Sequence, residues 1–225
     1  MTKGVRIDNG NGFQRVGSGN VRIWDDHNWK PGKALAWDGH EWINLLEERH
    51  VTTWEATWSQ GYWSWGAPKG NEGYLLWKGN HPLQGCYQPF YDRYDRGNAG
   101  GMIGFDDGNI RAQLAGARIE KVEFYAYYEH WAYYAGGEAV IGTHNNRGWA
   151  GRFWESNHGV AHARYYGRHQ GQWITLPNWV GDNFRDNKLC GITIHADNNG
   201  LWQYGVMAGT NDGWKKPKLR ITYVN

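Results

Sequence analysis

The sequence predicts an all-β protein, a jelly-roll β-sandwich preceded by an N-terminal arm of short β-hairpin repeats. Its 225 residues include 33 Gly, 16 Trp and 14 Tyr but only 3 Met, and aromatic, glycine-rich chains favour strands and tight turns over helices. Short runs of β-branched and aromatic residues are separated by turn signals, without sustained helical periodicity. A short unit near the N-terminus also occurs twice. These observations predict many short strands arranged in two structural parts.

The repeated unit predicts the arm. Residues 21–29 and 34–42 are two copies of one pattern, in which Trp, Asp, His and Trp recur thirteen positions apart. Each copy has the pattern of a strand, a tight turn and a second strand, and a two-stranded hairpin is at best marginally stable alone. We therefore expect residues 1–50 to attach the protein to further copies or to a larger assembly. The tryptophans expected to make these contacts are Trp24, Trp29, Trp37 and Trp42.

Residues 51–225 are expected to form the sandwich. The strongest strand pattern is at 117–128, where apolar and polar residues alternate. Residues 61–97, rich in Trp, Tyr, Gly and Pro, are expected to form hairpins and irregular loops, and residues 106–116 a crossover with a helical turn. The expected strands, in order, are 51–60, 101–105, 117–128, 140–144, 173–176, 191–195 and 218–224.

Charge and hydropathy argue against two classes of partner. The net charge is +2, without a block of like charge, whereas phosphate binding needs concentrated Lys and Arg, so no nucleic-acid partner is predicted. The longest apolar runs, such as 124–128, are far shorter than the ~20 residues that span a bilayer, so no membrane partner is predicted. Residues 1–8 lack the apolar region of a secretory signal, which predicts synthesis in a cytoplasm.

Cysteines, histidines and acidic residues predict no cofactor. Cys86 and Cys190 allow one disulfide or two buried thiols, and cytoplasmic synthesis favours the thiols. His158 and His162 are four residues apart in a segment without a helical pattern, so we expect them in a polar loop or on a strand rather than at a metal ion. Jelly-roll binding modules often carry a structural calcium ion, but no acidic run here has the spacing of a calcium loop.

Three motifs in the second part resemble a known family. They are residues 102–125, where MIGFD leads through a spacer to GARIEKVEFY, the turn at 198–201 (NNGL), and the closing residues 216–223 (KPKLRITY). These resemble the DNRLRE-type β-sandwich family over residues 52–225. The resemblance implies a non-catalytic jelly roll of the kind found in carbohydrate-binding modules and adhesion proteins. The chain departs from the family in its crossover, which has Asp-Gly-Asn at 107–109 in place of Ser.

The arm resembles a second group of proteins. Its Trp-Asp repeat, with Lys-Pro-Gly-Lys at 30–33 between the copies, is similar to N-terminal hairpins of minor tail proteins from phages of actinobacteria and other Gram-positive hosts. Residues 139–144 (AVIGTH) look like the sandwich domains of those proteins. The resemblance implies a virion protein that is made in the host cytoplasm without a signal peptide and is released by lysis. The implied partners are other virion proteins, a host cell-surface polysaccharide, and further copies of the chain, for example in a trimer.

Mixtures of flat aromatic rings and short polar side chains predict a glycan site. Sugars stack their C–H faces on Trp or Tyr, while Asp, Asn, Gln and Arg bind the hydroxyls. Such mixtures occur at 58–65, 87–96 and 129–134. Core or interface packing is the alternative, because alternate aromatics of a sandwich strand point inward, as we expect for Phe124 and Tyr128. The ligand-binding residues predicted from these segments are Trp63, Trp65, Tyr91, Asp92, Arg93, Tyr94 and Trp131.

Catalysis is the less favoured alternative. Asp92 with Asp95, or Asp106 with Asp107, could supply the two carboxyls of a glycosidase, which lie roughly 5–9.5 Å apart across a cleft, but surface turns explain these acids equally well. The sequence has no nucleophile elbow and no P-loop. Together with the two resemblances, the sequence predicts a non-catalytic phage tail protein that binds a host glycan. A capsid decoration or purely structural assembly protein, and a glycan-degrading enzyme, are the alternatives.

Overall fold

The computed structural model describes residues 6–8, 13–15, 21–24, 27–32, 34–37, 39–40, 42–44, 47–64, 66–69, 79–86 and 97–225. The chain divides into two compact units. One unit, called the arm below, contains Met1–His50 with the short pieces Gly116–Arg118 and Tyr223–Asn225. The other unit, called the sandwich, contains Val51–Ala115 and Ile119–Thr222.

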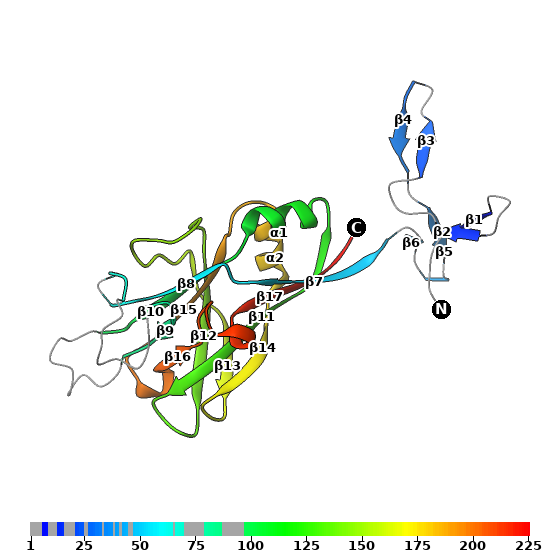
Figure 1. The fold of residues 1–225 in the computed structure, drawn as a ribbon. Coiled ribbons are helices and arrows are strands. Elements are labelled where there is room, and N and C mark those ends of the chain that lie inside the picture. The colour runs from blue at the N-terminus through cyan, green and yellow to red at the C-terminus, as the bar shows by residue number, and fades with distance from the viewer. Residues whose placement is uncertain are drawn as a thin grey trace. The chain divides into compact units, whose positions relative to one another are not determined.

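The six strands between residues 6 and 44 of the arm pair as two-stranded hairpins (Figure 1). Both copies of the repeat fold alike, because Trp24 lies opposite Trp29 and Trp37 lies opposite Trp42, each at the last strand pair before the turn. In the second turn Gly39 has a φ of +103°, a conformation that suits glycine. The predicted hairpin repeats are confirmed. The strands are β1 (Arg6–Asp8), β2 (Phe13–Arg15), β3 (Arg22–Trp24), β4 (Trp29–Pro31), β5 (Leu35–Trp37) and β6 (Trp42–Asn44).

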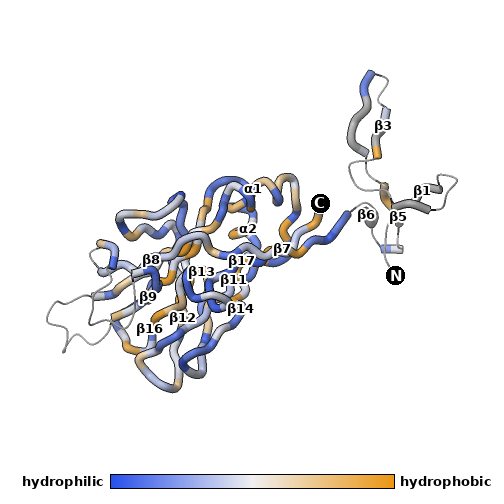
Figure 2. Tube along the Cα trace, in the orientation of Figure 1, coloured by the Kyte–Doolittle hydropathy of each residue, from blue (hydrophilic) through white to orange (hydrophobic). Residues whose placement is uncertain are grey.

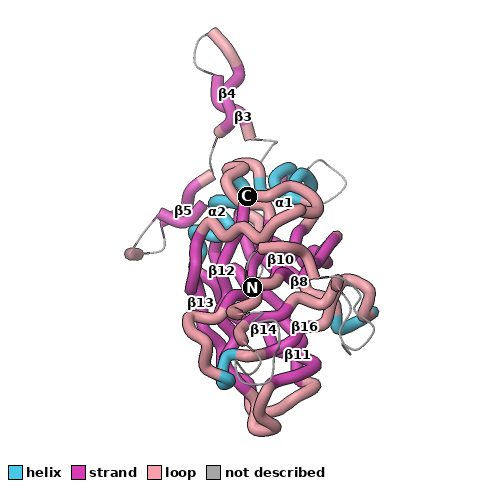
Figure 3. The backbone as a smooth tube through the Cα atoms, turned by 90° about the vertical axis from the view of Figure 1, so that its left-hand side faces the viewer, coloured by secondary structure: helices cyan, strands magenta, loops and turns pink. Residues whose placement is uncertain are grey.

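Two antiparallel sheets form the sandwich, which confirms the predicted fold class (Figures 1 and 3). Consecutive strands from β8 to β12, and again from β13 to β16, alternate between the sheets, which is the winding of a jelly roll. One sheet has the order β13-β12-β15-β10-β8, and the other has the order β7-β17-β11-β16-β9, with β14 also paired to β11. The strands are β7 (Arg49–Glu55), β8 (Trp58–Tyr62), β9 (Leu83–Gln84), β10 (Gly100–Gly104), β11 (Arg118–Trp131), β12 (Gly137–His144), β13 (Asn157–Tyr165), β14 (Gln170–Leu176), β15 (Gly191–His195), β16 (Gly205–Met207) and β17 (Lys218–Val224).

The core lies between the sheets. On β11, Val122 and Phe124 are fully buried opposite Leu176 and Ile174 of β14, and Tyr128 is buried further along the same strand. Apolar and polar stretches alternate along the chain of the sandwich (Figure 2). The prediction that Phe124 and Tyr128 are core residues is confirmed.

Some predicted strand boundaries need correction. Residues 51–60 form two strands, β7 and β8, which belong to different sheets, because the chain turns at Ala56 and Thr57. The nine-residue strand β13 was not predicted, since its sequence, NHGVAHARY, is dominated by small and polar residues that carry little strand signal.

Two short helices lie together at one end of the sandwich (Figure 1). Helix α1 (Asp107–Leu114) replaces the expected helical turn, and its N-cap Asp106 accepts a hydrogen bond of 3.0 Å from the Asn109 backbone N–H. Helix α2 (Asn178–Arg185) was not predicted, because its eight residues include Gly, Asn and Asp, which are poor helix formers. It is held by burial of Val180 and Phe184. Neither described helix is long and apolar enough to cross a membrane.

Both cysteines are buried, and no disulfide joins them. Burial raises the pKa of the Cys190 thiol, which disfavours the reactive thiolate. This agrees with the expectation of two structural thiols.

Candidate ligand-binding loop and histidine–carboxylate cluster

The β12–β13 loop, residues 145–156, crosses the outer face of the five-stranded sheet. It leaves β12 at His144 and reaches β8, three strands away, where the Tyr62 hydroxyl donates a 2.6 Å hydrogen bond to the Ala150 carbonyl. The Trp149 indole donates to Gln60 on the same strand, at 3.4 Å. The chain then returns over the sheet to β13. Attachment at both edges fixes the path of the loop.

Outward-facing glycines allow the loop to lie directly on the sheet. Gly100 is paired with Tyr62 on one side and with His195 on the other. The Phe153 ring packs between these two neighbours, with ring centroids 5.9 Å from Tyr62 and 5.1 Å from His195. A Cβ atom at Gly100 would lie 2.6 Å from the Phe153 ring, closer than side chains pack. The absence of a side chain at Gly100 therefore leaves the space that the Phe153 ring occupies.

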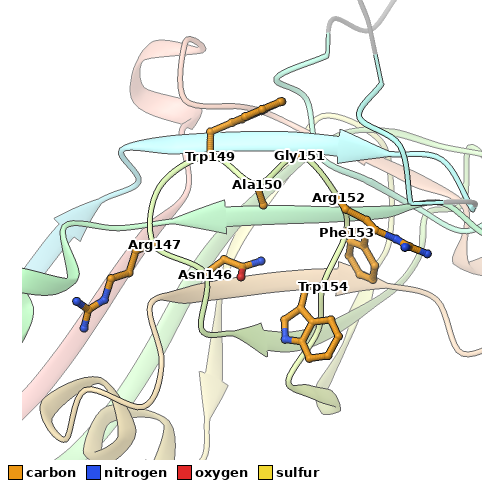
Figure 4. A pocket seen from close by; sticks show the side chains of 8 residues that line it. All are labelled: Asn146, Arg147, Trp149, Ala150, Gly151, Arg152, Phe153 and Trp154. Atoms are coloured by element: carbon orange, nitrogen blue, oxygen red, sulfur yellow. The ribbon is translucent and has the colours of Figure 1, made fainter.

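The loop lines an open, shallow cavity of about 370 Å³, formed by residues 146–147 and 149–154. Figure 4 shows the Asn146 and Trp154 side chains within the arch of the loop, and Arg147 on its outer side. Trp149 and Trp154 are 60% and 57% exposed. Arg147 is held by Asp107, at 3.5 Å, and by Asn187. The site therefore combines exposed indole rings with amide and guanidinium groups.

These two indoles differ from Trp202 and Tyr134, which are also exposed. The Arg164 guanidinium lies 3.4 Å above the Trp202 ring, and Arg168 lies 3.9 Å above Tyr134, so a cation already covers a face of each ring. In the part of the chain that the structure describes, no cation or aromatic ring contacts the rings of Trp149 and Trp154. Their faces are available to a ligand.

A cluster of histidines and carboxylates follows at the end of the loop. Glu155 Oε2 lies 2.9 Å from His158 Nδ1 and 3.4 Å from His195 Nδ1. Asp197 lies 2.9 Å from His158 Nε2 through one oxygen and 2.9 Å from His162 Nε2 through the other. The five side chains therefore form a continuous chain of polar contacts from β13 to the end of β15.

Both carboxylates of the cluster are ionised at neutral pH. Burial would raise the pKa of Glu155, but hydrogen bonds from His195 and Thr193 bring that pKa below its usual range. Burial likewise opposes ionisation of Asp197, and hydrogen bonds from His162, Gln203 and His158 lower its pKa. An ionised carboxylate only accepts hydrogen bonds.

A β-bulge brings the two β13 histidines to one carboxylate. The pairing of β12 with β13 shifts between Ile141 and Thr143, opposite the stretch that contains His158. Gly159 has a φ of +60° within this bulge. Bulges re-aim side chains near functional sites, and here His158 and His162 both reach Asp197.

Two of the predicted ligand residues, Trp63 and Trp131, are core residues. Trp63 packs with Leu83, Ala99 and Val206 in a core cluster, and Trp131 is fully buried. A sugar cannot stack on either ring, because the hydrophobic gain of burying the indole has already placed it inside the sandwich. The predictions for Trp65, Tyr91, Asp92, Arg93 and Tyr94 lie outside the described residues.

The other predicted sites are placed as follows. In the arm, Trp24 and Trp37 are 51% and 55% exposed, while Trp29 and Trp42 are described by their backbone only. Of the acids considered for catalysis, Asp106 caps α1, and Asp107 pairs with Arg111 and Arg147 at 3.5 Å each. Asp92 and Asp95 are not among the described residues. The observed acids have structural roles.

Sequence reasoning missed the β12–β13 loop. The loop contains Trp149 and Trp154, five residues apart, in a stretch rich in Asn, Gly and Arg. It therefore has the same mixture of aromatic and polar side chains as the three segments predicted to bind a glycan. No family model matches the chain, and no curated protein matches it. The resemblances to the DNRLRE-type family and to phage tail proteins therefore enter the next subsection as proposals.

Proposed function

We propose that the chain is a non-catalytic virion protein whose sandwich binds a host cell-surface glycan at the β12–β13 loop. The observation that carries this proposal is the pair of exposed indoles, Trp149 and Trp154, beside a cavity of about 370 Å³. Ligand sites combine concave shape, aromatic walls and a few polar groups. Asn146 and Arg152 supply the polar groups here.

An already ordered loop favours glycan binding, because immobilising a loop on binding costs free energy. Three anchors hold this loop before the ligand arrives. Phe153 is seated on Gly100, Ala150 accepts the Tyr62 hydrogen bond, and Glu155 is tied to the histidine cluster. The indoles are therefore presented on a fixed scaffold.

Replacing either indole is expected to weaken glycan binding by about tenfold or more, which corresponds to about 1.4 kcal/mol. Trp149→Ala and Trp154→Ala each remove one stacking surface from an exposed position, so the fold should remain intact. Trp214→Ala is the matched control, because Trp214 is exposed but packs edge-on against Tyr127. Binding of the labelled full chain is measured on intact bacteria and on purified cell-wall and capsular polysaccharides.

Saturable binding that Trp214→Ala retains and both loop variants weaken would support the proposal. Equal binding by all three variants would contradict a site at this loop. Binding to no surface by the unmodified chain would favour a purely structural or capsid decoration protein.

Assembly through the arm is a second candidate role. Exposed tryptophans are common anchors at protein–protein interfaces, and the two hairpins present Trp24 and Trp37 at equivalent positions. We propose a homo-oligomer, such as a trimer, in which these rings become buried against other copies or other virion proteins.

The oligomer gives its own prediction. The full chain is expected to have a multiple of the 25.9 kDa chain mass in size-exclusion chromatography with light scattering. The double variant Trp24→Ala/Trp37→Ala should shift the mass towards one chain, while Trp214→Ala should not. A monomeric mass for the unmodified chain would refute this role.

A further inference from the structure

The cluster at the end of the β12–β13 loop has the composition of a metal site. Glu155, His158 and His195 each offer one ligand atom, and these atoms lie within 4.8 Å of one another. They come from the loop, from β13 and from β15, so the fold brings together groups up to forty residues apart. We propose that Glu155, His158 and His195 form a binding site for a divalent transition-metal ion, with Zn²⁺ the best fit.

The distances suit a small ion. Zinc binds imidazole nitrogen at about 2.0–2.1 Å and carboxylate oxygen at about 2.0–2.2 Å, which places the ligands of a tetrahedral site roughly 3.3–3.5 Å apart. Glu155 Oε2 lies 2.9 Å from His158 Nδ1 and 3.4 Å from His195 Nδ1. Small side-chain rotations therefore suffice to admit the ion.

Outer groups orient two of the three ligands. With Nδ1 bound to the ion, His158 can donate its Nε2–H to Asp197, which lies 2.9 Å away. The Thr193 hydroxyl donates to Glu155 Oε1, which leaves Oε2 for the ion. A carboxylate behind a ligating histidine fixes the tautomer and ring orientation at zinc sites. A surface His–Glu pair without a ligand-binding role would not require a second carboxylate and a hydroxyl group to orient it.

The donor set selects the class of ion. Two imidazole nitrogens and one carboxylate suit Zn²⁺ and its neighbours, whereas Ca²⁺ takes six to eight oxygen ligands. The side chains of Glu155, His195 and His158 are 11%, 29% and 42% exposed. The ion can therefore enter from solvent, and water can complete its coordination.

Zinc titration tests the proposal. The full chain, made without a polyhistidine tag and stripped with a chelator, is titrated with ZnCl₂ in a calorimeter. We expect one ion per chain, with affinity at least 10-fold lower for His158→Ala and for His195→Ala. Asp197→Asn should lower affinity by about 10–100-fold without removing the site, the usual effect of losing an outer-shell partner.

His169→Ala is the matched control. His169 Nδ1 lies 2.9 Å from Glu129 Oε2, so it is a histidine–glutamate pair at the surface, and its removal should leave zinc affinity unchanged. Circular dichroism without zinc checks the fold of each variant. If an alanine variant does not fold, Glu155→Gln and His195→Gln take its place, because they retain polar side chains of similar size.

Three results would overturn the proposal. These are the absence of stoichiometric zinc binding by the unmodified chain, unchanged affinity in folded His158 and His195 variants, and calcium binding as tight as zinc binding. The readout is metal binding alone, so failure of the glycan proposal would not affect it.

Discussion

Replacing Trp131 with alanine is expected to lower the free energy of unfolding by about 3–5 kcal/mol, the usual cost of truncating a buried tryptophan. The indole is fully buried, stacks on Tyr128 with ring centroids 4.1 Å apart, and lies 5.4 Å from Tyr165. The backbone at Gly137 and Gly205 closes against the ring, since a Cβ atom at either position would lie within 2.6 Å of it. Urea unfolding of the full chain measures the loss.

Two further variants separate packing from other causes. Gly137→Ala adds a methyl group 2.2 Å from the ring and should cost about 1–3 kcal/mol or more through overpacking. Trp131→Phe should cost less than Trp131→Ala, because it keeps an aromatic ring and removes Nε1, a buried donor without a partner among the described residues. A loss below about 1 kcal/mol for Trp131→Ala, with weakened glycan binding, would return this residue to the ligand surface.

Local sequence patterns predicted the strands that carry strong β-branched signals. Residues 191–195 (GITIH) and 218–224 (KLRITYV) match β15 and β17 residue for residue. The tandem repeat predicted its hairpins equally well, because a turn between paired tryptophans is a local feature. Strand β13 and helix α2 have weak local signals and are stabilised by strand pairing and burial. A local sequence pattern carries no information about these tertiary interactions.

The candidate site could not be assembled from the sequence for a different reason. His158 and His162 lie on the bulged strand β13, in agreement with the expected loop or strand, but their four-residue spacing does not identify their partners. Their carboxylate partners, Glu155 and Asp197, come from a loop and from beyond β15. Only the strand order β13-β12-β15 brings these segments together, and strand order is not a local property of the sequence.

His144 is expected to make the free energy of unfolding fall by about 2 kcal/mol between pH 7 and pH 5. The neutral ring uses both nitrogens: Nε2 donates to the Ile103 carbonyl at 3.0 Å, and Nδ1 accepts from the Asn146 N–H at 3.2 Å. Burial lowers the pKa of His144 from 6.5 to about 4. The unfolded chain therefore binds a proton near pH 6.5 that the folded chain does not bind until about pH 4, so stability is lost as the pH falls through this window.

Two other titratable groups, His130 and Glu123, also contribute to the pH dependence of stability. Burial, followed by the charge of Arg168, lowers the pKa of His130 to about 4, so His130 contributes to the same window. Glu123 acts at lower pH, because the Arg220 hydrogen bond holds its pKa below the ordinary value of 4.5. Its contribution to stability is present above pH 4.5 and is lost only as the pH falls below that value.

His144→Gln isolates the contribution of His144, because glutamine does not titrate but can still donate to the Ile103 carbonyl. Urea unfolding at pH 7, 6 and 5 should give a shallower loss of stability for this variant than for the unmodified chain, with a difference of about 2 kcal/mol at pH 5. His169→Ala, at an exposed position, should retain the His144-dependent slope. Parallel pH profiles for His144→Gln and the unmodified chain would mean that His144 gains its proton equally in both states, and that the contacts to Ile103 and Asn146 do not hold the ring neutral.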